Sequence, residues 1–180
     1  MLPLVRRKVV QVISLDKLDV TLLDVLTRDA RAGIIEIANR LGIARNTVQA
    51  RLRRLEEAGL LTGVHPSLDL AQAGVTTQAF IGLEVLQARL APIVEALGRI
   101  PHVLEVHATT GREDLLVRAA AVSQAGLQEL IERLVGIDGV VHSTTTLALT
   151  TPLPYRAIPL LQEITRDAGW GRATPAAHAE

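Results

Sequence analysis

The chain has 180 residues, equal numbers of acidic and basic side chains, and 48% hydrophobic residues. This hydrophobic content is enough to form a buried core, and it excludes a wholly disordered chain. Only 2% of the residues are aromatic and none is cysteine. The composition therefore argues against binding of single-stranded nucleic acid by aromatic stacking, and it excludes disulfides and thiolate chemistry.

The charges are unevenly distributed along the chain. Residues 1–65 contain 11 Lys and Arg against 7 Asp and Glu, whereas residues 66–180 contain 8 against 12. A basic first third suits a partner that carries phosphates. No run approaches the roughly 20 apolar residues of a membrane span, and the N-terminus lacks the pattern of a signal peptide. We therefore expect a cytoplasmic protein without a membrane partner.

Residues 34–55 predict two helices joined by a tight turn. Gly42 stands where the turn needs a backbone conformation that glycine adopts easily. The small Ala38 allows close approach of the helices, and Val48 falls where the second helix meets it. This spacing is typical of a helix-turn-helix, in which the second helix lies in the major groove of DNA.

A further amphipathic stretch, residues 16–29, predicts a helix that precedes the other two and completes a three-helix module. Ser14 or Asp16 could cap it. We expect Gly59 to end the second helix of the motif, and the residues after it to form a short extended wing or linker that Pro66 interrupts.

The second helix of the motif has two different sides. Val48, Leu52 and Leu55 form an inward apolar stripe, and polar side chains project from the other side. Arginine can bond guanine in a bidentate pair, and asparagine or glutamine can bond adenine. The candidates for base contacts are Arg45, Asn46, Gln49 and Arg53. The alternative is an ordinary solvated helix, and Ala44 provides no side-chain cap at its start.

Two further arginines, Arg51 and Arg54, flank this polar side and suit phosphates. Arg51 could instead form a structural ion pair with an acidic residue of the first helix. Both interpretations remain open from the sequence.

The second half of the chain contains a repeat. Residues 90–110 match residues 127–147 without a gap at an offset of 37 positions, and each copy predicts a helix followed by a strand. Strand-like runs at 77–86 and 113–121 precede the two copies. The order is therefore βαββαβ, the ferredoxin-like arrangement.

The predicted strands carry apolar residues on both faces, as Ile81 and Phe80 illustrate. Two helices would cover only one face of a four-stranded sheet, so we expect the other face to be buried against a second copy of the chain. Homodimerisation is the prediction, and a larger assembly is compatible with it.

The predicted fold class is α+β, with a winged helix-turn-helix joined to a ferredoxin-like domain. The predicted divisions are an N-terminal extension (1–13), a DNA-binding domain (14–64), a linker strand (65–76), the ferredoxin-like domain (77–152), and a C-terminal helix with a flexible tail (153–180). Within the last division we expect the helix over 156–167 and the tail over 169–180.

Three blocks of this sequence together resemble the Lrp/AsnC family of transcription regulators, also called feast/famine regulators. The blocks are LDKLDVTLLDVLTRDAR, LGIARNTVQARLRRLEEAGLLTG and TTGREDLLV. The second is similar to the family pattern TVxxRxxxLExxGxI, which adds Thr47 to the candidate DNA-binding residues, and the third is similar to the family's GxxD loop. The resemblance covers about residues 14–152.

The resemblance implies dimers or octamers that bind double-stranded DNA and take an amino acid or related metabolite at an interface of the ferredoxin-like domains. The GxxD loop takes part in that site, so the candidate effector-binding residues are Thr110, Gly111, Arg112 and Asp114. Arginine can pair with an α-carboxylate, and aspartate can accept from an α-ammonium group. The alternative is that this segment is merely the turn of a β-hairpin. Leu115 stands where family members often have an aromatic residue.

Enzyme functions find little support in the sequence. No HExxH, CxxC or nucleophile-elbow motif is present, and we expect no metal and no cofactor. Siroheme decarboxylases resemble this family in both domains, but their aromatic-rich strand is absent around His107. A third possibility is an architectural protein that compacts DNA with little sequence preference.

Overall fold

The structure, a computed structural model, describes residues 12–172 and divides them into two compact units. The helical unit combines residues 12–67 with residues 154–172, and the sheet unit comprises residues 68–153. Among the helices of the described residues, none combines the length and hydrophobicity that a membrane crossing requires.

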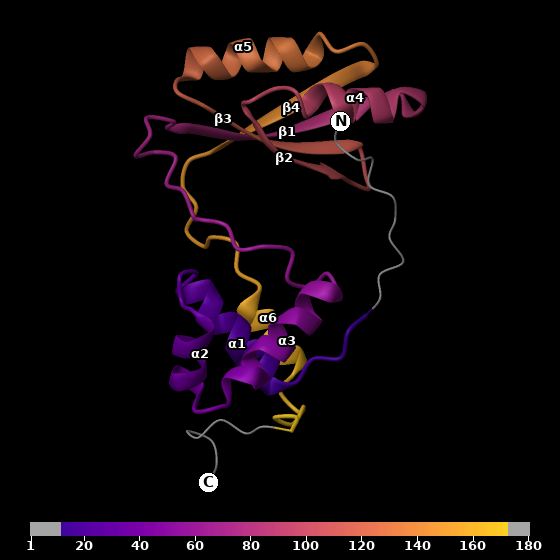
Figure 1. The fold of residues 1–180 in the computed structure, drawn as a ribbon. Helices are drawn as coiled ribbons and strands as arrows, with labels where there is room; N and C mark the ends of the chain where they lie inside the picture. The colour runs from indigo at the N-terminus through magenta and orange to yellow at the C-terminus, as the bar shows by residue number, and fades with distance from the viewer. Residues whose placement is uncertain (1–11, 173–180) are drawn as a thin grey trace. The chain divides into compact units, whose positions relative to one another are not determined.

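The helical unit contains four helices (Figure 1): α1 (Lys17–Arg28), α2 (Ile34–Leu41), α3 (Arg45–Glu57) and α6 (Ile158–Ile164). Asp16 caps α1, as one of the two expected caps. The Asp19 N–H donates to its carboxylate at 2.9 Å, and the Asp16 N–H donates back to the Asp19 carboxylate at 3.1 Å. This reciprocal capping box bonds two N–H groups that a helix start leaves unpaired.

The predicted helix-turn-helix is confirmed. Gly42 ends α2 with a φ of +64°, and its N–H bonds the carbonyls of Ala38 and Asn39. The left-handed conformation explains the glycine at this position. Ala38 and Val48 are both buried in one cluster with Leu18, Leu22, Ile37 and Leu41, which joins α1, α2 and α3.

The expected linker strand over 65–76 is wrong. Residues 58–76 contain turns and irregular backbone but no strand. A strand requires a neighbouring strand to bond its N–H and C=O groups. The four strands of the sheet pair only with one another, so residues 65–76 have no strand partner there. Pro66 also lacks the N–H that a ladder needs.

The sheet unit follows the predicted βαββαβ order. Its elements are β1 (Thr77–Val85), η1 (Gln87–Arg89), α4 (Leu90–Leu97), β2 (Val103–Ala108), β3 (Leu115–Ala121), α5 (Gln124–Val135) and β4 (Val140–Ala148). The strands form one antiparallel sheet in the order β2-β3-β1-β4. Figure 1 shows α4 and α5 on the same side of it.

The sheet unit's core lies between this side of the sheet and the two helices. Alternate residues of β1 and β3, such as Ile81 and Val117, are fully buried there against Ile93 of α4 and Leu130 of α5. The alternation follows from the two-residue period of a strand. The repeat found in the sequence therefore corresponds to two equivalent helix–strand pairs that build one core.

Within residues 68–153, no helix covers the opposite face of the sheet. Phe80 lies on this open face, directly between Arg118 of β3 and Thr146 of β4. Leu147 pairs with Ala79 and therefore lies on the helix-covered side. The irregular register between Glu84 and Val85 shifts the parity of β4. The open face thus carries the Phe80 ring between a charged neighbour and a polar one.

The C-terminal part of the chain differs most from expectation. The helix α6 is shorter than the predicted 156–167, and it packs on α1. Residues 169–172 are not a free tail, because the Lys17 N–H donates to the Gly169 carbonyl at 3.0 Å and Trp170 packs against the core of the helical unit. The remaining tail residues 173–180, and residues 1–11 of the N-terminal extension, lie outside the described residues.

Candidate nucleic-acid interface and effector loop

The outward side of α3 presents a polar surface. Arg45, Asn46, Gln49 and Arg53 are all exposed, and Thr47 is half-buried. Val48 and Leu55 on the inward side are fully buried. The amphipathic division of α3 expected from the sequence is present, and it brings the four candidates for base contacts onto one solvent-facing surface. We call these four residues the α3 face.

The inward side of α3 is fixed to α1 by ion pairs as well as by apolar contacts. Arg51 bonds the carboxylates of Asp16 and Asp19, each at 2.7 Å, and Arg54 bonds the second oxygen of Asp19. Asp19 is 0% exposed. A buried carboxylate of this kind requires charged partners and hydrogen bonds to remain ionised. Asp16, Asp19, Arg51 and Arg54 form what we call the α1–α3 ion-pair network.

The network shifts the ionisation of its members. Burial by itself raises the pKa of Asp19, but hydrogen bonds from Arg54, the Asp16 N–H and Arg51 outweigh it and lower the pKa. Burial likewise opposes the charge of Arg51, yet its bonds to Asp16 and Asp19 raise the pKa of the guanidinium. Both charges are therefore stable across the neutral range.

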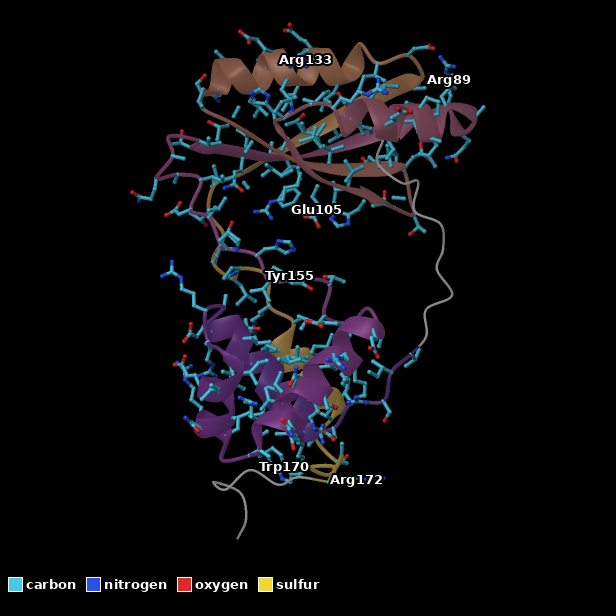
Figure 2. The ribbon with its side chains drawn as sticks, viewed as in Figure 1. Arg89, Glu105, Arg133, Tyr155, Trp170 and Arg172 are labelled. Atoms are coloured by element: carbon cyan, nitrogen blue, oxygen red, sulfur yellow. The ribbon has the colours of Figure 1, made fainter. Side chains whose placement is uncertain are left out.

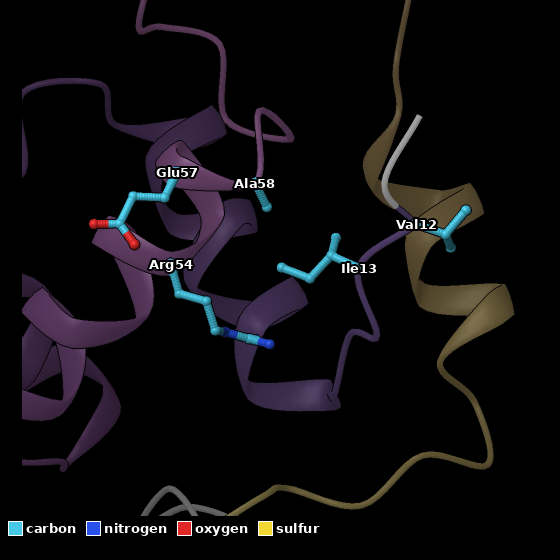
Figure 3. Close-up of a pocket in the computed structure, with 5 residues that line it drawn as sticks. All are labelled: Val12, Ile13, Arg54, Glu57 and Ala58. Atoms are coloured by element: carbon cyan, nitrogen blue, oxygen red, sulfur yellow. The ribbon is translucent and has the colours of Figure 1, made fainter. Parts of the chain in front are cut away.

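Arg51 accordingly forms the structural ion pair that the sequence left as an alternative to a phosphate contact, and we no longer count it as a DNA-binding candidate. Arg54 has a mixed position: nearly half its side chain is exposed, but its guanidinium also donates to the Ser14 carbonyl at 3.2 Å. Figure 3 shows it reaching from α3 towards the segment that precedes α1, on the side away from Glu57. An open hollow of about 400 Å³ lies between this end of α3 and Ile13.

The candidate effector loop connects β2 and β3. The Thr109 N–H donates to the Asp114 carbonyl at 3.0 Å, which closes the loop, and Gly111 has a φ of +125° with open space beside it. Thr110 is exposed. A side chain at 111 would strain the backbone, so glycine here serves the turn.

Two residues of this loop contact the end of β1. The Asp114 carboxylate accepts from the Val85 N–H at 2.8 Å and from the Gln87 side-chain amide. The Arg112 guanidinium bonds Glu84 at 2.7 Å, and this pairing raises the pKa of Arg112. The Asp114 carboxylate therefore holds the loop on β1.

The comparisons with known proteins agree with both parts of this description. A family model described as winged helix-turn-helix DNA-binding matches residues 15–62, and one described as Lrp/AsnC ligand binding domain matches residues 78–158. The HTH-type transcriptional regulator Ptr1 of Methanocaldococcus jannaschii is 32% identical over 138 residues, which are 76% of this chain and 93% of that protein. The chain belongs to the Lrp/AsnC family.

Solved structures of Lrp/AsnC regulators have the same fold. Escherichia coli AsnC superposes with a TM-score of 0.75 at 26% identity, over 82% of this chain and 100% of that one. A transcriptional regulator of Neisseria meningitidis, solved as a complex with L-Met, superposes with a TM-score of 0.72 at 25% identity, over 78% of this chain and 94% of that one. This Lrp/AsnC protein is therefore a DNA-binding transcriptional regulator with a separate ligand-binding domain.

Sequence reasoning missed several residues of this Lrp/AsnC regulator. Glu84 and Gln87 were not predicted as partners of the loop. Glu84 is the single charged residue of β1, and this was a signal that could have found it. Glu113 was also missed; its side chain lies where a side chain at Gly82 would stand. Within residues 12–172, no group of three His, Cys, Asp or Glu side chains is placed to hold a metal ion.

Proposed function

We propose that this regulator acts in the cytoplasm as a homodimer, that the α3 face reads base pairs of its operator, and that an amino acid bound at the effector loop modulates DNA binding. The observation that carries the proposal is the division of α3 into a solvent-facing polar side and a side fixed to α1 by buried ion pairs. A side chain can discriminate between bases only when its helix is held in a defined orientation.

The four residues of the α3 face have two roles in the proposal. Arg45 and Arg53 donate to guanine or to phosphates near the groove, whereas Asn46 and Gln49 pair with adenine. No side chain caps the start of α3 at Ala44. The free N–H groups of the first turn therefore suit a phosphate oxygen.

The decisive experiment measures binding to the DNA upstream of the protein's own gene and to random duplexes of equal length. Gln49→Ala should lower discrimination at one base pair by about 1–3 kcal/mol, because one bidentate contact is lost. Gln128→Ala, an exposed glutamine on α5, is the control and should leave binding unchanged. Unaltered base preference in Gln49→Ala would refute the assignment. Equal affinity for random and upstream DNA would favour an architectural protein instead.

The open face of the sheet supports the homodimer. Phe80 is 40% exposed at its centre, and no helix of the same unit covers it. Arg118 lies beside Phe80 and opposite Glu105 of β2 in the sheet register. Aromatic and arginine side chains are the types enriched at protein interfaces. Two copies meeting face to face would bury both Phe80 rings.

The dimer is tested with a matched pair of variants. Val94 lies on α4 and is also 40% exposed. Phe80→Glu should shift the mass measured by light scattering towards the monomer, because it buries a charge in the interface, whereas Val94→Glu should keep the wild-type mass. A dimer or larger assembly that survives Phe80→Glu would show that this face is not the interface.

The effector loop fits a zwitterion. Arg112 is well exposed and its partner Glu84 is partly buried, so an amino acid could place its carboxylate on Arg112 and its ammonium group on Glu84. Each charge would exchange one ionic partner for another. The complex of the Neisseria meningitidis relative with L-Met supports an amino acid as the class of ligand.

Calorimetric titration with a panel of amino acids tests this site. Arg112→Ala should abolish the heat of binding. The control is Arg99→Ala, which should retain it: Arg99 is an exposed arginine that follows α4 and pairs with Glu95 of that helix. Retention of full binding by Arg112→Ala would place the effector elsewhere. Modulation of DNA binding further requires that the effector bind the free and DNA-bound forms with different affinities.

A further inference from the structure

Residues 158–172, which we call the C-terminal segment, lie almost entirely beyond the family matches. The ligand-binding-domain match ends at residue 158, where α6 begins. The whole of Escherichia coli AsnC superposes on 82% of this chain. The ligand-binding-domain match thus leaves nearly all of the C-terminal segment outside it, and the place of this segment in the helical unit needs a separate explanation.

The helix α1 has a second apolar side, and the C-terminal segment covers it. Leu18 faces α2 and α3, whereas Val20, about 200° further round the helix, is only 2% exposed. Val20 and Thr21 share a hollow of about 190 Å³ with Gln162 and Thr165 of the segment. The buried side of the segment includes Thr165, whose hydroxyl donates to the Leu161 carbonyl at 2.7 Å and so remains satisfied.

The segment then reaches the start of α1. Gly169 accepts a hydrogen bond from the Lys17 N–H at 3.0 Å, one of the N–H groups that a helix start leaves without an intrahelical partner. Trp170 follows and packs against the core of the helical unit. Figure 2 labels Trp170 and Arg172 at this end of the helical unit.

The last contact is with the ion-pair network itself. Gly171 has a φ of +69°, and a Cβ atom there would overlap the Asp16 carboxylate and the Arg51 guanidinium. The backbone of the segment therefore lies directly against this ion pair. Excluding water from the pair strengthens its attraction, and Arg51 belongs to α3.

We propose that the C-terminal segment positions α3 for DNA binding: it docks on α1, covers the Asp16–Arg51 pair, and so holds the α3 face in its DNA-binding orientation. Gly171 is the positioning residue in this scheme, because it acts on α3 through Asp16 and Arg51. Gly169 and Trp170 hold the segment in place on the helical unit. The proposal rests on the proposed DNA-binding role of the α3 face.

The first test uses full-length Gly171→Ala. A methyl group at 171 strains the backbone and displaces the ion pair, so upstream-DNA affinity should fall about tenfold while far-ultraviolet circular dichroism keeps its helical signal. Trp170 is the only tryptophan of the chain, and its fluorescence should shift to longer wavelength as the segment leaves the core. Gly74→Ala is the matched control: Gly74 has a φ of +82° but open space beside it, and DNA affinity should stay within about twofold of wild type.

Two outcomes of this test would overturn the proposal. One is a shifted Trp170 emission with wild-type DNA affinity, since α3 would then not depend on the segment. The other is unchanged emission together with unchanged affinity, since Gly171 would then not lie against the pair.

The second test needs no variant and decides the matter even if Gly171→Ala unfolds. Coupling between two sites is reciprocal, so upstream DNA should favour the docked segment and slow hydrogen exchange at the Lys17 amide several-fold. The control is the Gly126 amide, which the Ser123 hydroxyl caps at the start of α5. DNA binding without slower exchange at Lys17 would refute the positioning role. Failure of the wild-type protein to bind DNA would instead refute the proposed function, while Trp170 emission would still report docking.

Discussion

The two units of this protein differ in the kind of contact that stabilises each of them internally. The core of the sheet unit is formed by apolar side chains alone, from Ala79 on β1 to Leu134 on α5. The helical unit has a smaller apolar cluster and, beside it, the fully buried carboxylate of Asp19 with two arginine partners. The contrast shows that two units of one chain can rely on different interactions, apolar burial in one and buried ion pairs in the other.

Apolar burial is strong but has no preferred direction, so it suits a unit that must be stable and can bury one face against a second copy. An arginine bonds a carboxylate in a fixed planar geometry. A buried ion pair is often no more stabilising than apolar residues of the same size, yet it can specify one arrangement. We infer that the α1–α3 ion-pair network sets the direction of α3 rather than the overall stability.

The largest predicted effect breaks this network. Asp19→Ala should destabilise the helical unit by about 3–5 kcal/mol, because it removes the buried carboxylate that Arg51 and Arg54 share. Urea unfolding followed by Trp170 fluorescence measures it. Asp24→Ala, which removes the more exposed pair with Arg28, should cost no more than about 0.5 kcal/mol. A loss below 1 kcal/mol in Asp19→Ala would show that the two arginine charges do not depend on Asp19 in the folded protein.

A cavity in the other core sharpens the comparison. Leu134 on α5 is fully buried, so Leu134→Ala should destabilise the sheet unit by about 2–5 kcal/mol through lost burial and the cavity left behind. Far-ultraviolet circular dichroism follows the unfolding of the sheet, and Trp170 fluorescence follows the helical unit in the same samples. The midpoint from Trp170 should stay near its wild-type value. If both midpoints fall equally, the two units unfold as one.

The smallest predicted effect is a dependence of the helical unit's stability on pH. The pKa of Asp19 is lowered in the folded protein from its ordinary value of 3.8. The stability that its charge contributes is therefore fully present above that value and is lost as the pH falls through the lower, folded pKa. The urea midpoint from Trp170 should be flat between neutral pH and about pH 5 and should fall below about pH 4. Asp19→Asn should flatten this fall, and an equally steep fall in that variant would assign it to other groups.

Much of the architecture could be predicted from local patterns. The spacing of Ala38, Gly42 and Val48 was sufficient for the helix-turn-helix, because each position has a distinct steric requirement. The ungapped repeat was sufficient for βαββαβ, since each copy encodes its own helix and strand. For the α3 face, a single helical period placed the exposed residues correctly.

Features that depend on distant contacts could not be predicted in this way. Arg51 and Arg53 are two positions apart and chemically identical, and only the location of Asp19 distinguishes a structural arginine from one free to meet DNA. The parity of β4 depends on an irregular register beside Val85, which no pattern of hydrophobicity reveals. One feature of the sequence could have predicted the docking of Trp170: α1 has a second apolar side, at Val20.

The helical unit is assembled from two stretches that lie on either side of the sheet unit in the chain. During synthesis, α1 to α3 leave the ribosome first, the whole ligand-binding domain follows, and Trp170 comes only after it. Domains generally fold in the order in which they emerge. Here α1 to α3 gain their full set of contacts only when Gly169 and Trp170, near the end of the chain, have been synthesised. A nascent chain that stops before residue 169 lacks the hydrogen bond to Lys17 and the Trp170 contact. Under the proposed positioning role, DNA binding therefore begins only after the ligand-binding domain has been translated.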